Sequence, residues 1–111
     1  MKGDERKAAI ASYKERDDVA GIYQVRCAAS GETWVGQTLN LDTVQNRIWF
    51  TLRLGNHPRR ALQEAWRDHG AESFAFAVLE RLADEESSFV RDALLKERVA
   101  HWRSALGAQA I

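Results

Sequence analysis

Two short segments of alternating residues, 21–27 and 32–37, lie on either side of a four-residue turn signal. Both contain the β-branched and aromatic residues that favour strands. The pattern predicts a β-hairpin, and symmetric closure places Val25 opposite Trp34 and Cys27 opposite residue 32. Because side chains alternate along a strand, four residues then share one face of the sheet: Tyr23, Val25, Trp34 and Gly36.

The rest of the chain adds helices and one further strand. Apolar residues spaced three or four apart predict helices over residues 41–54, from His57 to Gly70, and over 87–106. A polar, alanine-bearing segment predicts another short helix over 5–16. Residues 73–79 are apolar on both faces, which is typical of a covered central strand.

The predicted helices have recognisable first and last residues. Asn40 or Thr38 can cap the helix over 41–54, and Asp84 or Ser87 can cap the last helix, because short polar side chains satisfy free N–H groups. A glycine follows each of the last three helices and favours the left-handed turn that ends a helix. These residues are Gly55, Gly70 and Gly107.

The element order is therefore α-ββ-αα-β-α. That order predicts an α+β domain in which helices pack on a small antiparallel sheet. The chain has no linker and no internal repeat, so we expect residues 21–111 to form one globular unit, with residues 1–20 as a helical extension. A chain of 111 residues can bury a core without disulfides or metals.

Composition narrows the possible functions. Sixteen lysines and arginines balance 16 aspartates and glutamates, so the chain lacks the overall basic charge of many nucleic-acid-binding domains. Positive charge nevertheless gathers in residues 43–70, and negative charge gathers in 80–100. Cys27 is the only cysteine, which excludes an internal disulfide. No apolar stretch reaches the ~20 residues of a membrane helix, and no secretory signal is visible, so we expect a cytoplasmic protein.

The two predicted strands contain Gly21-Ile22-Tyr23 and Trp34-Val35-Gly36, which resemble the signature strands of the GIY-YIG nuclease family. Residues 46–52 resemble most closely a branch of this family found beside bacterial transcription regulators. The resemblance implies a three-stranded antiparallel sheet surrounded by helices, in agreement with the element order. It covers about residues 20–103 and includes further matches in the family's order: Asn40-Leu41, Gly55, His57, Leu62-Gln63, Trp66, Gly70, Phe74, Phe76 and Leu79-Glu80.

The resemblance also implies a chemistry, the hydrolysis of phosphodiesters with one divalent cation such as Mg²⁺ or Mn²⁺. In the family a tyrosine on the first strand serves as base or orients water, and a second tyrosine supports the site. An arginine on a helix steadies the phosphate, and a glutamate on the last helix holds the metal. These groups suit a pentacoordinate phosphate, which accumulates negative charge, and a hard cation, which needs carboxylate oxygen.

Residue by residue, this chain departs from that pattern. Tyr23 matches the first tyrosine, whereas Trp34 keeps a ring at the second position and lacks the hydroxyl. The position expected for the arginine is Val44, and the position expected for the glutamate is Val99. A valine can hold neither a phosphate nor a metal, and both valines lie on the apolar stripes of their predicted helices.

Neighbouring residues offer substitutes for the two missing groups. Arg47 lies one turn after Val44 and about 60° around the helix, so its long side chain can reach the same pocket. Glu97 precedes Val99 by two residues and points about 200° away from it on a straight helix. Glu80, at the end of the predicted third strand, is a second candidate metal ligand.

A basic group near the middle of the chain is a candidate for nucleic-acid binding. His57 matches a histidine of the resembled branch and precedes a helix N-terminus, where anions bind readily. Two arginines follow it directly in that helix. The complete set predicted to bind nucleic acid is Arg47, Arg53, His57, Arg59 and Arg60.

Three functions follow from these observations. The first is binding of DNA or RNA by a GIY-YIG-like domain whose hydrolytic machinery is degenerate. The second is an active, metal-dependent endonuclease with a relocated site, in which Tyr23 orients water, Arg47 steadies the phosphate and Glu97 or Glu80 holds the metal. The third is a protein-interaction module, or a homodimer, that uses apolar surface around Trp34 and Trp49.

Overall fold

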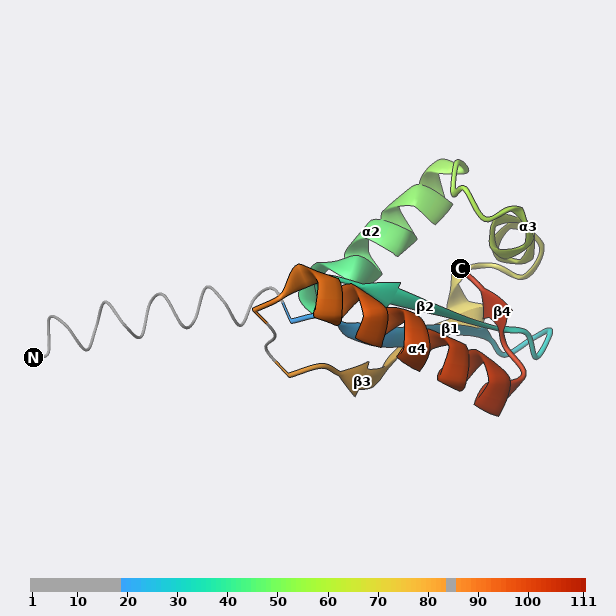
Figure 1. Ribbon diagram of the computed structural model, residues 1–111. Coiled ribbons are helices and arrows are strands. Elements are labelled where there is room, and N and C mark those ends of the chain that lie inside the picture. Colours follow the sequence, from blue (N-terminus) through green and yellow to red (C-terminus); the bar gives the residue numbers. More distant parts are fainter. Residues whose placement is uncertain (1–18, 84–85) are drawn as a thin grey trace, which may run out of the picture.

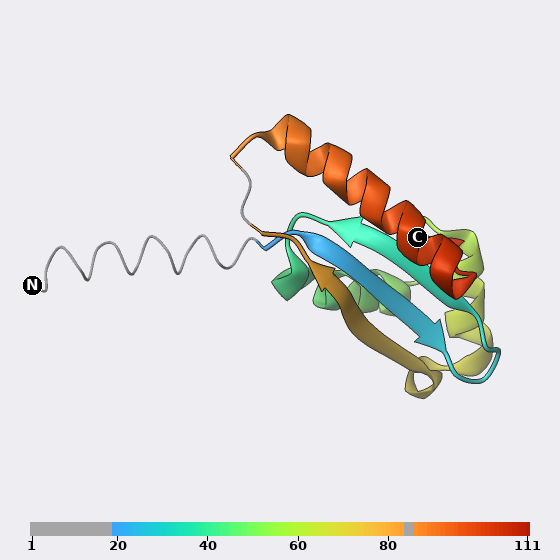
Figure 2. The same cartoon turned by 60° about the horizontal axis from the view of Figure 1, so that its bottom comes forward.

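The computed structural model describes residues 19–83 and 86–111 (Figure 1). The helix predicted over 5–16 and the candidate cap Asp84 lie outside the described residues. The α+β class is confirmed, because one sheet has helices on both faces (Figure 1; Figure 2). The strands are β1 (Gly21–Cys27), β2 (Thr33–Thr38), β3 (Phe74–Arg81) and β4 (Gln109–Ala110). The helices are α2 (Leu41–Leu54), α3 (Arg60–His69), the 3-10 turn η1 (Ala71–Ser73) and α4 (Ser88–Leu106).

The predicted hairpin forms with the expected register. Val25 lies opposite Trp34 in the antiparallel pair β1–β2, and the N–H of Cys27 donates to the carbonyl of Glu32 at 2.9 Å. β1 also pairs antiparallel with β3, so the strand order is β3-β1-β2-β4.

The sheet has four strands, so the prediction of three is wrong by one. The extra strand, β4, runs parallel to β2 and pairs Gln109 with Trp34 and Ala110 with Val35. A strand of two residues is too short to produce an alternating pattern, which explains why the sequence does not reveal it. β4 nevertheless covers part of the outer edge of β2.

The prediction that residues 73–79 form a central strand is also wrong. β3 lies at one edge of the sheet and pairs only with β1 in the described part of the chain. Its residues are apolar on both sides because helices cover both faces of the sheet even at this edge. Phe76 packs on the α2 side, whereas Leu79 packs on the α4 side.

The core is split into two layers by the sheet. On one face, α2 and α3 bury residues such as Leu52 and Leu62 against Tyr23, Val25 and Trp34. On the other face, α4 buries a smaller layer, formed by Leu95 and Val99 with Ile22 and Val35. Figure 2 shows α4 alone over its side of the sheet.

The helix limits follow the local signals closely. α2 starts and ends as predicted, because Asn40 accepts the N–H of Asp42 at 2.9 Å and Gly55 adopts the left-handed conformation. Ser87 caps α4 by accepting the N–H of Val90 at 3.2 Å. α3 begins at Arg60 instead of His57, because residues 57–59 form a turn that side-chain hydrogen bonds hold.

Candidate nucleic-acid interface

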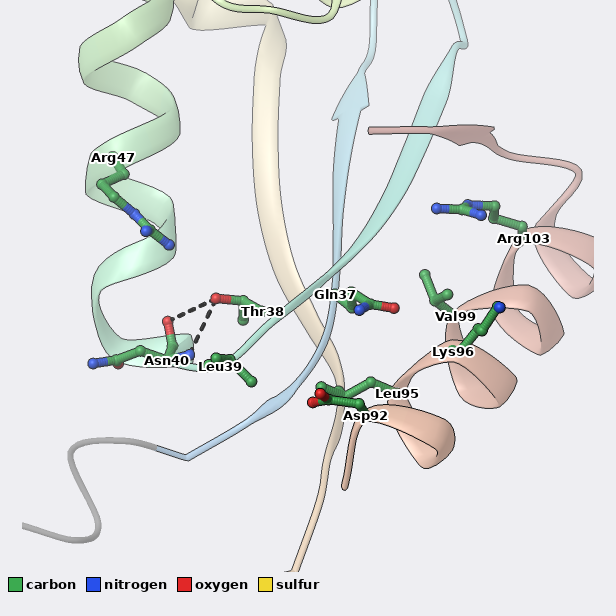
Figure 3. Close-up of a pocket in the computed structure, with 10 residues that line it drawn as sticks. All are labelled: Gln37, Thr38, Leu39, Asn40, Arg47, Asp92, Leu95, Lys96, Val99 and Arg103. Carbon is green, nitrogen blue, oxygen red and sulfur yellow. Dashed lines mark hydrogen bonds between the residues drawn. The ribbon is translucent and has the colours of Figure 1, made fainter. Parts of the chain in front are cut away.

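A pocket of about 800 Å³ lies at the C-terminal end of β2, between α2 and α4 (Figure 3). Arg47 reaches it from α2, on one side of β2, and Lys96 and Arg103 reach it from α4, on the other side. Gln37 lies between the two groups on the strand itself. The pocket therefore collects positive charge from two helices that pack on opposite faces of the sheet.

A second pocket, of about 240 Å³, adjoins the first and shares Gln37, Thr38 and Arg47 with it. This smaller pocket is also lined by Tyr23 from β1 and by His57 from the turn before α3. The two pockets together are called the cleft below. The structure thus brings together three of the predicted site residues, which come from separate elements: Tyr23, Arg47 and His57.

The loop between β2 and α2 fixes the direction from which Arg47 enters the cleft. The hydroxyl of Thr38 accepts the N–H of Asn40 at 3.1 Å and donates to the carbonyl of the same residue at 3.3 Å (Figure 3). Asn40 then caps the first turn of α2. Because both ends of this loop are held, the start of α2 and the position of Arg47 two turns later are set together.

Tyr23 lies almost completely inside the protein, with 5% of its surface exposed. Its ring stacks on Phe76, with centroids 5.5 Å apart. Burial raises the pKa of Tyr23 to about 12, although the nearby charges of Arg47 and Arg103 oppose this shift. At neutral pH the phenol is therefore protonated, so it acts as a hydrogen-bond donor and not as a base.

His57 is held by two hydrogen bonds at the edge of the cleft. The backbone N–H of His57 donates to Oε1 of Gln63 at 2.9 Å. The ring Nδ1 of His57 accepts the backbone N–H of Arg59, also at 2.9 Å. Partial burial lowers the pKa of His57, which favours the neutral ring. Since Nδ1 is the acceptor, the hydrogen of the neutral ring is on Nε2.

The side chains of the cleft thus offer mainly donors. Arg47 and Arg103 carry fixed positive charge, while Tyr23 and His57 add neutral O–H and N–H groups. Groups of this kind bind an oxyanion such as a phosphate, and guanidinium groups form paired hydrogen bonds with it.

The two positions where the resemblance expects an arginine and a glutamate lie in the walls of the cleft. Val44 lines the smaller pocket and Val99 lines the larger one. Both valines are buried, with 3% and 4% of their surfaces exposed, and pack into the layers under α2 and α4. They supply apolar wall to the cleft.

Neither predicted metal ligand lines the cleft. Glu80 accepts hydrogen bonds from Nε of Arg98 at 2.8 Å and from Nε1 of Trp102 at 2.9 Å, which ties β3 to α4. These two bonds stabilise the carboxylate and lower its pKa. Glu97 lies on the exposed side of α4.

Asp92 is the one carboxylate among the residues that line the two pockets. Its Oδ1 lies 3.3 Å from Nε of Arg91, and the other charged groups around the pocket are cations. In residues 19–83 and 86–111, no three histidine, cysteine, aspartate or glutamate side chains form a group that can hold a metal. The cations and hydrogen-bond donors of the cleft therefore suit an anion. They do not fit a divalent cation, which needs several oxygen ligands.

The remaining predicted nucleic-acid contacts lie outside the cleft. Arg53 is in the last turn of α2, Arg59 precedes α3 and Arg60 begins it, and all three are exposed. None of them lines either pocket. They form an exposed basic corner at the α2–α3 turn, next to His57.

Of the two tryptophans expected to offer apolar surface, Trp34 is buried and Trp49 is half-buried. Trp34 has no exposed surface and stacks on Phe74, and its Nε1 has no hydrogen-bond partner. Trp49 packs against Trp66, with ring centroids 5.5 Å apart, and is half-buried. Trp34 therefore gives no exposed ring to a nucleic-acid base or to a protein partner.

Lys96 and Arg103 are functional candidates that the sequence reasoning missed. They lie three residues before and four residues after Val99, so they share its side of α4. That spacing is visible in the sequence. The missing information was that this side of α4 meets the end of β2 and faces Arg47 from across the sheet edge.

The sheet and its flanking helices form the GIY-YIG-like fold of nuclease catalytic domains. The catalytic domain of the homing endonuclease I-TevI matches with a TM-score of 0.69 and 25% identity, covering 83% of this chain and 97% of that one. A mutant of the catalytic domain of the intron endonuclease I-TevI matches with a TM-score of 0.68 and 26% identity, covering 80% of this chain and 84% of that one.

Other comparisons add no closer assignment. No protein-family model matches the chain, and the comparison with curated proteins gives no match. No helix among the described residues is long and apolar enough to cross a membrane.

Proposed function

We propose that this chain is a nucleic-acid-binding domain that holds the sugar-phosphate backbone of DNA or RNA in the cleft, without divalent-metal-dependent hydrolysis. The observation that carries the proposal is the convergence of Arg47, Lys96 and Arg103 at the end of β2. Valines stand where the resembled site needs a charged group to steady phosphate and another to hold a metal.

Phosphate is the ligand that best fits the chemistry of the cleft. Contacts between cationic side chains and phosphates provide most of the sequence-independent affinity of nucleic-acid-binding proteins. Among the residues lining the cleft, Tyr23 is the one large aromatic ring, and it is buried against Phe76. Since no large ring in the cleft is free to stack on bases, the contacts that the cleft offers are ion pairs and hydrogen bonds, which suit the phosphates of the backbone.

The exposed basic corner extends the same surface. Arg53, Arg59 and Arg60 lie beside His57, which lines the smaller pocket. A strand that enters the cleft near Arg103 and leaves it near His57 meets these arginines next. The corner then adds weaker, solvent-exposed phosphate contacts to the stronger contacts of the cleft.

A binding titration tests the proposal. Fluorescence anisotropy with labelled DNA and RNA, in EDTA and low salt, compares wild type with the variant Arg47→Ala/Lys96→Ala/Arg103→Ala. A matched variant, Arg26→Ala/Arg67→Ala/Arg81→Ala, removes the same charge from exposed positions outside the cleft.

We expect the cleft variant to bind about 1,000-fold more weakly, since each of the three lost charged contacts costs roughly a factor of ten. The matched variant should stay within about threefold of wild type, because its three arginines lie outside the cleft. Equal weakening of both variants, or no binding by the wild type, would refute the proposal.

One observation favours a second candidate function, an active metal-dependent endonuclease. Asp92 lines the larger pocket and is the only acid there, so it replaces Glu97 and Glu80 as the candidate ligand for Mg²⁺ or Mn²⁺. Its pairing with Arg91 and its cationic surroundings weigh against this function. Metal-dependent cleavage that Asp92→Asn abolishes would establish it.

A further inference from the structure

An exposed aromatic ring lies beside the cleft, on the helix that carries Arg47. Phe50 has 55% of its surface exposed, and in the described part of the chain its ring contacts no other ring. Leu54, one turn later, is 59% exposed. Single apolar residues are ordinary on a protein surface, so what these two can do depends on their surroundings.

Phe50 and Leu54 lie on the same side of α2 as Arg47. At ~100° per residue, Phe50 is about 60° around the helix from Arg47, and Leu54 is about 20° from it. Side chains three residues apart on a helix are neighbours, with about 5–6 Å between their Cβ atoms. Thr51, the residue after Phe50, lines the smaller pocket. The ring therefore lies at the rim of the cleft, next to the cation that both pockets share.

This side of α2 leads from the cleft to the exposed basic corner. In Figure 1, α2 runs from the end of β2 towards α3, where the corner lies. Phe50 comes between Arg47 and Arg53 in the helix, and Arg59 and Arg60 follow after the turn. Positive charge thus flanks the ring on both sides. An apolar protein surface would leave these charges without partners, whereas a ligand that combines phosphates with flat rings matches both features.

An unpaired nucleotide has this combination of groups. Its phosphate is an anion that guanidinium groups bind, and the flat face of its base stacks on aromatic side chains. In a duplex each base is paired and covered by its neighbours, so it offers no free face to a ring at the protein surface. The contact with Phe50 is therefore open to a single strand and closed to a duplex.

We propose that the cleft binds single-stranded nucleic acid in preference to a duplex, with one unpaired base stacked on Phe50 while the neighbouring phosphate pairs with Arg47. This inference rests on the proposed function, because it needs phosphates in the cleft, and it adds the class of nucleic acid. Since every base has a flat face, the stacking adds affinity without selecting a base sequence.

Binding of matched single strands and duplexes tests the preference. Fluorescence anisotropy in EDTA and low salt follows a labelled strand of mixed sequence, alone and annealed to its complement, as DNA and as RNA. Four proteins are compared: wild type, Phe50→Ala, Phe50→Tyr, which keeps a ring, and the control Leu94→Ala. Leu94 is also exposed, at 37%, but it precedes Lys96 by two residues and points about 200° away from it on α4.

We expect wild type to bind the single strand about tenfold more tightly than the duplex. Phe50→Ala should weaken single-strand binding about tenfold, the cost of losing one stacked base, and should change duplex binding less than about twofold. Phe50→Tyr and Leu94→Ala should stay within about threefold of wild type on both ligands. Circular dichroism shows whether each variant keeps the fold.

The salt dependence separates this inference from the proposed function. The slope of log K against log salt concentration reports phosphate contacts, and stacking is not part of it. Phe50→Ala should therefore bind the single strand more weakly at every salt concentration, with an unchanged slope. Equal affinity of wild type for single strand and duplex, or single-strand binding that Phe50→Ala leaves unchanged, would overturn the preference while the proposed function stands. Absence of binding to every ligand would refute both.

A second copy of the chain is the competing occupant of the surface around Phe50. Sedimentation of free wild type and Phe50→Ala, at the concentrations of the titrations, tests this alternative. We expect both proteins to sediment alike, as monomers. A wild-type dimer that Phe50→Ala dissociates would show that this side of α2 packs against protein, and would overturn the proposal.

Discussion

At the level of single residues, the surroundings of Tyr23 in the cleft set its protonation state. Tyr23 could be singled out from the sequence because it lies in a recognisable strand motif. Its protonation state could not, since that depends on Phe76 and Ile111, which are far away in the sequence. With a pKa of about 12, the phenol donates a hydrogen bond at neutral pH.

The raised pKa of Tyr23 predicts a loss of stability at high pH. The folded pKa lies above the ordinary value of 10, so the stabilisation is complete below pH 10 and is lost as the pH rises to about 12. Urea unfolding of Tyr13→Phe should therefore lose up to about 3 kcal/mol across this range relative to Tyr13→Phe/Tyr23→Phe. Parallel pH profiles for the two proteins would show that Tyr23 ionises normally.

Glu80 is expected to act in stability and not in metal binding. Glu80→Gln should lower the free energy of unfolding by about 1–3 kcal/mol, because Arg98 and Trp102 lose a charged acceptor. The exposed control Glu97→Gln should stay within about 0.5 kcal/mol of wild type. Denaturant titrations at neutral pH measure both.

The same carboxylate gives a test at low pH. The pKa of Glu80 is lowered in the folded state, so its contribution is present above pH 4.5 and is lost as the pH falls through the folded pKa. Wild type and Glu80→Gln should therefore converge in stability in acid. A difference in stability between the two proteins that persists at the lowest pH would mean that the charge of Glu80 does not stabilise its contacts with Arg98 and Trp102.

At the level of elements, local signals were sufficient for most of the fold. The hairpin and the limits of α2 and α4 follow from alternation, caps and glycines that lie next to each other in the sequence. The two errors in the sheet concern position, not local structure. The apolar sequence of β3 predicts a central strand because helices cover both of its faces, although β3 lies at an edge of the sheet. A strand as short as β4 has no alternating pattern of apolar and polar residues.

The N-cap residue Asn40 stabilises α2, the helix that carries Arg47 into the cleft. Asn40→Ala should lower the free energy of unfolding by about 1 kcal/mol, because the N–H of Asp42 loses its acceptor. Asn40→Asp keeps a side-chain oxygen at this position and should restore most of the loss. Thermal unfolding of the three proteins measures the effect, and an Asn40→Asp variant as unstable as Asn40→Ala would exclude the cap as the cause.

At the level of the whole molecule, the cleft exists because two helices on opposite faces of the sheet meet at one strand end. Arg47 comes from the α2 side and Arg103 from the α4 side (Figure 3). The sequence showed Arg47 as a candidate, but it held no information on which side of α4 would meet β2. Long-range packing, not local pattern, brings these charges together.

This arrangement predicts a defined salt dependence of nucleic-acid binding. The three cations of the cleft should by themselves contribute about −2 to −3 to the slope of log K against log salt concentration, and contacts at the basic corner should add to it. Arg103→Ala should reduce that slope by about one, and the control Arg81→Ala should leave it unchanged. Anisotropy titrations over a series of salt concentrations give the slopes, and equal slopes for all three proteins would place the contacts elsewhere.

The measurement that tests the central claim most directly is a cleavage assay on supercoiled plasmid, single-stranded DNA and RNA. Wild type, Tyr23→Phe and Asp92→Asn are each incubated with Mg²⁺, Mn²⁺ or EDTA, and binding is followed in the same samples. We expect binding in the presence and in the absence of the metal. We also expect the substrate to stay intact in every sample. Cleavage by wild type that requires the metal and is lost in Tyr23→Phe would contradict a cleft that only binds.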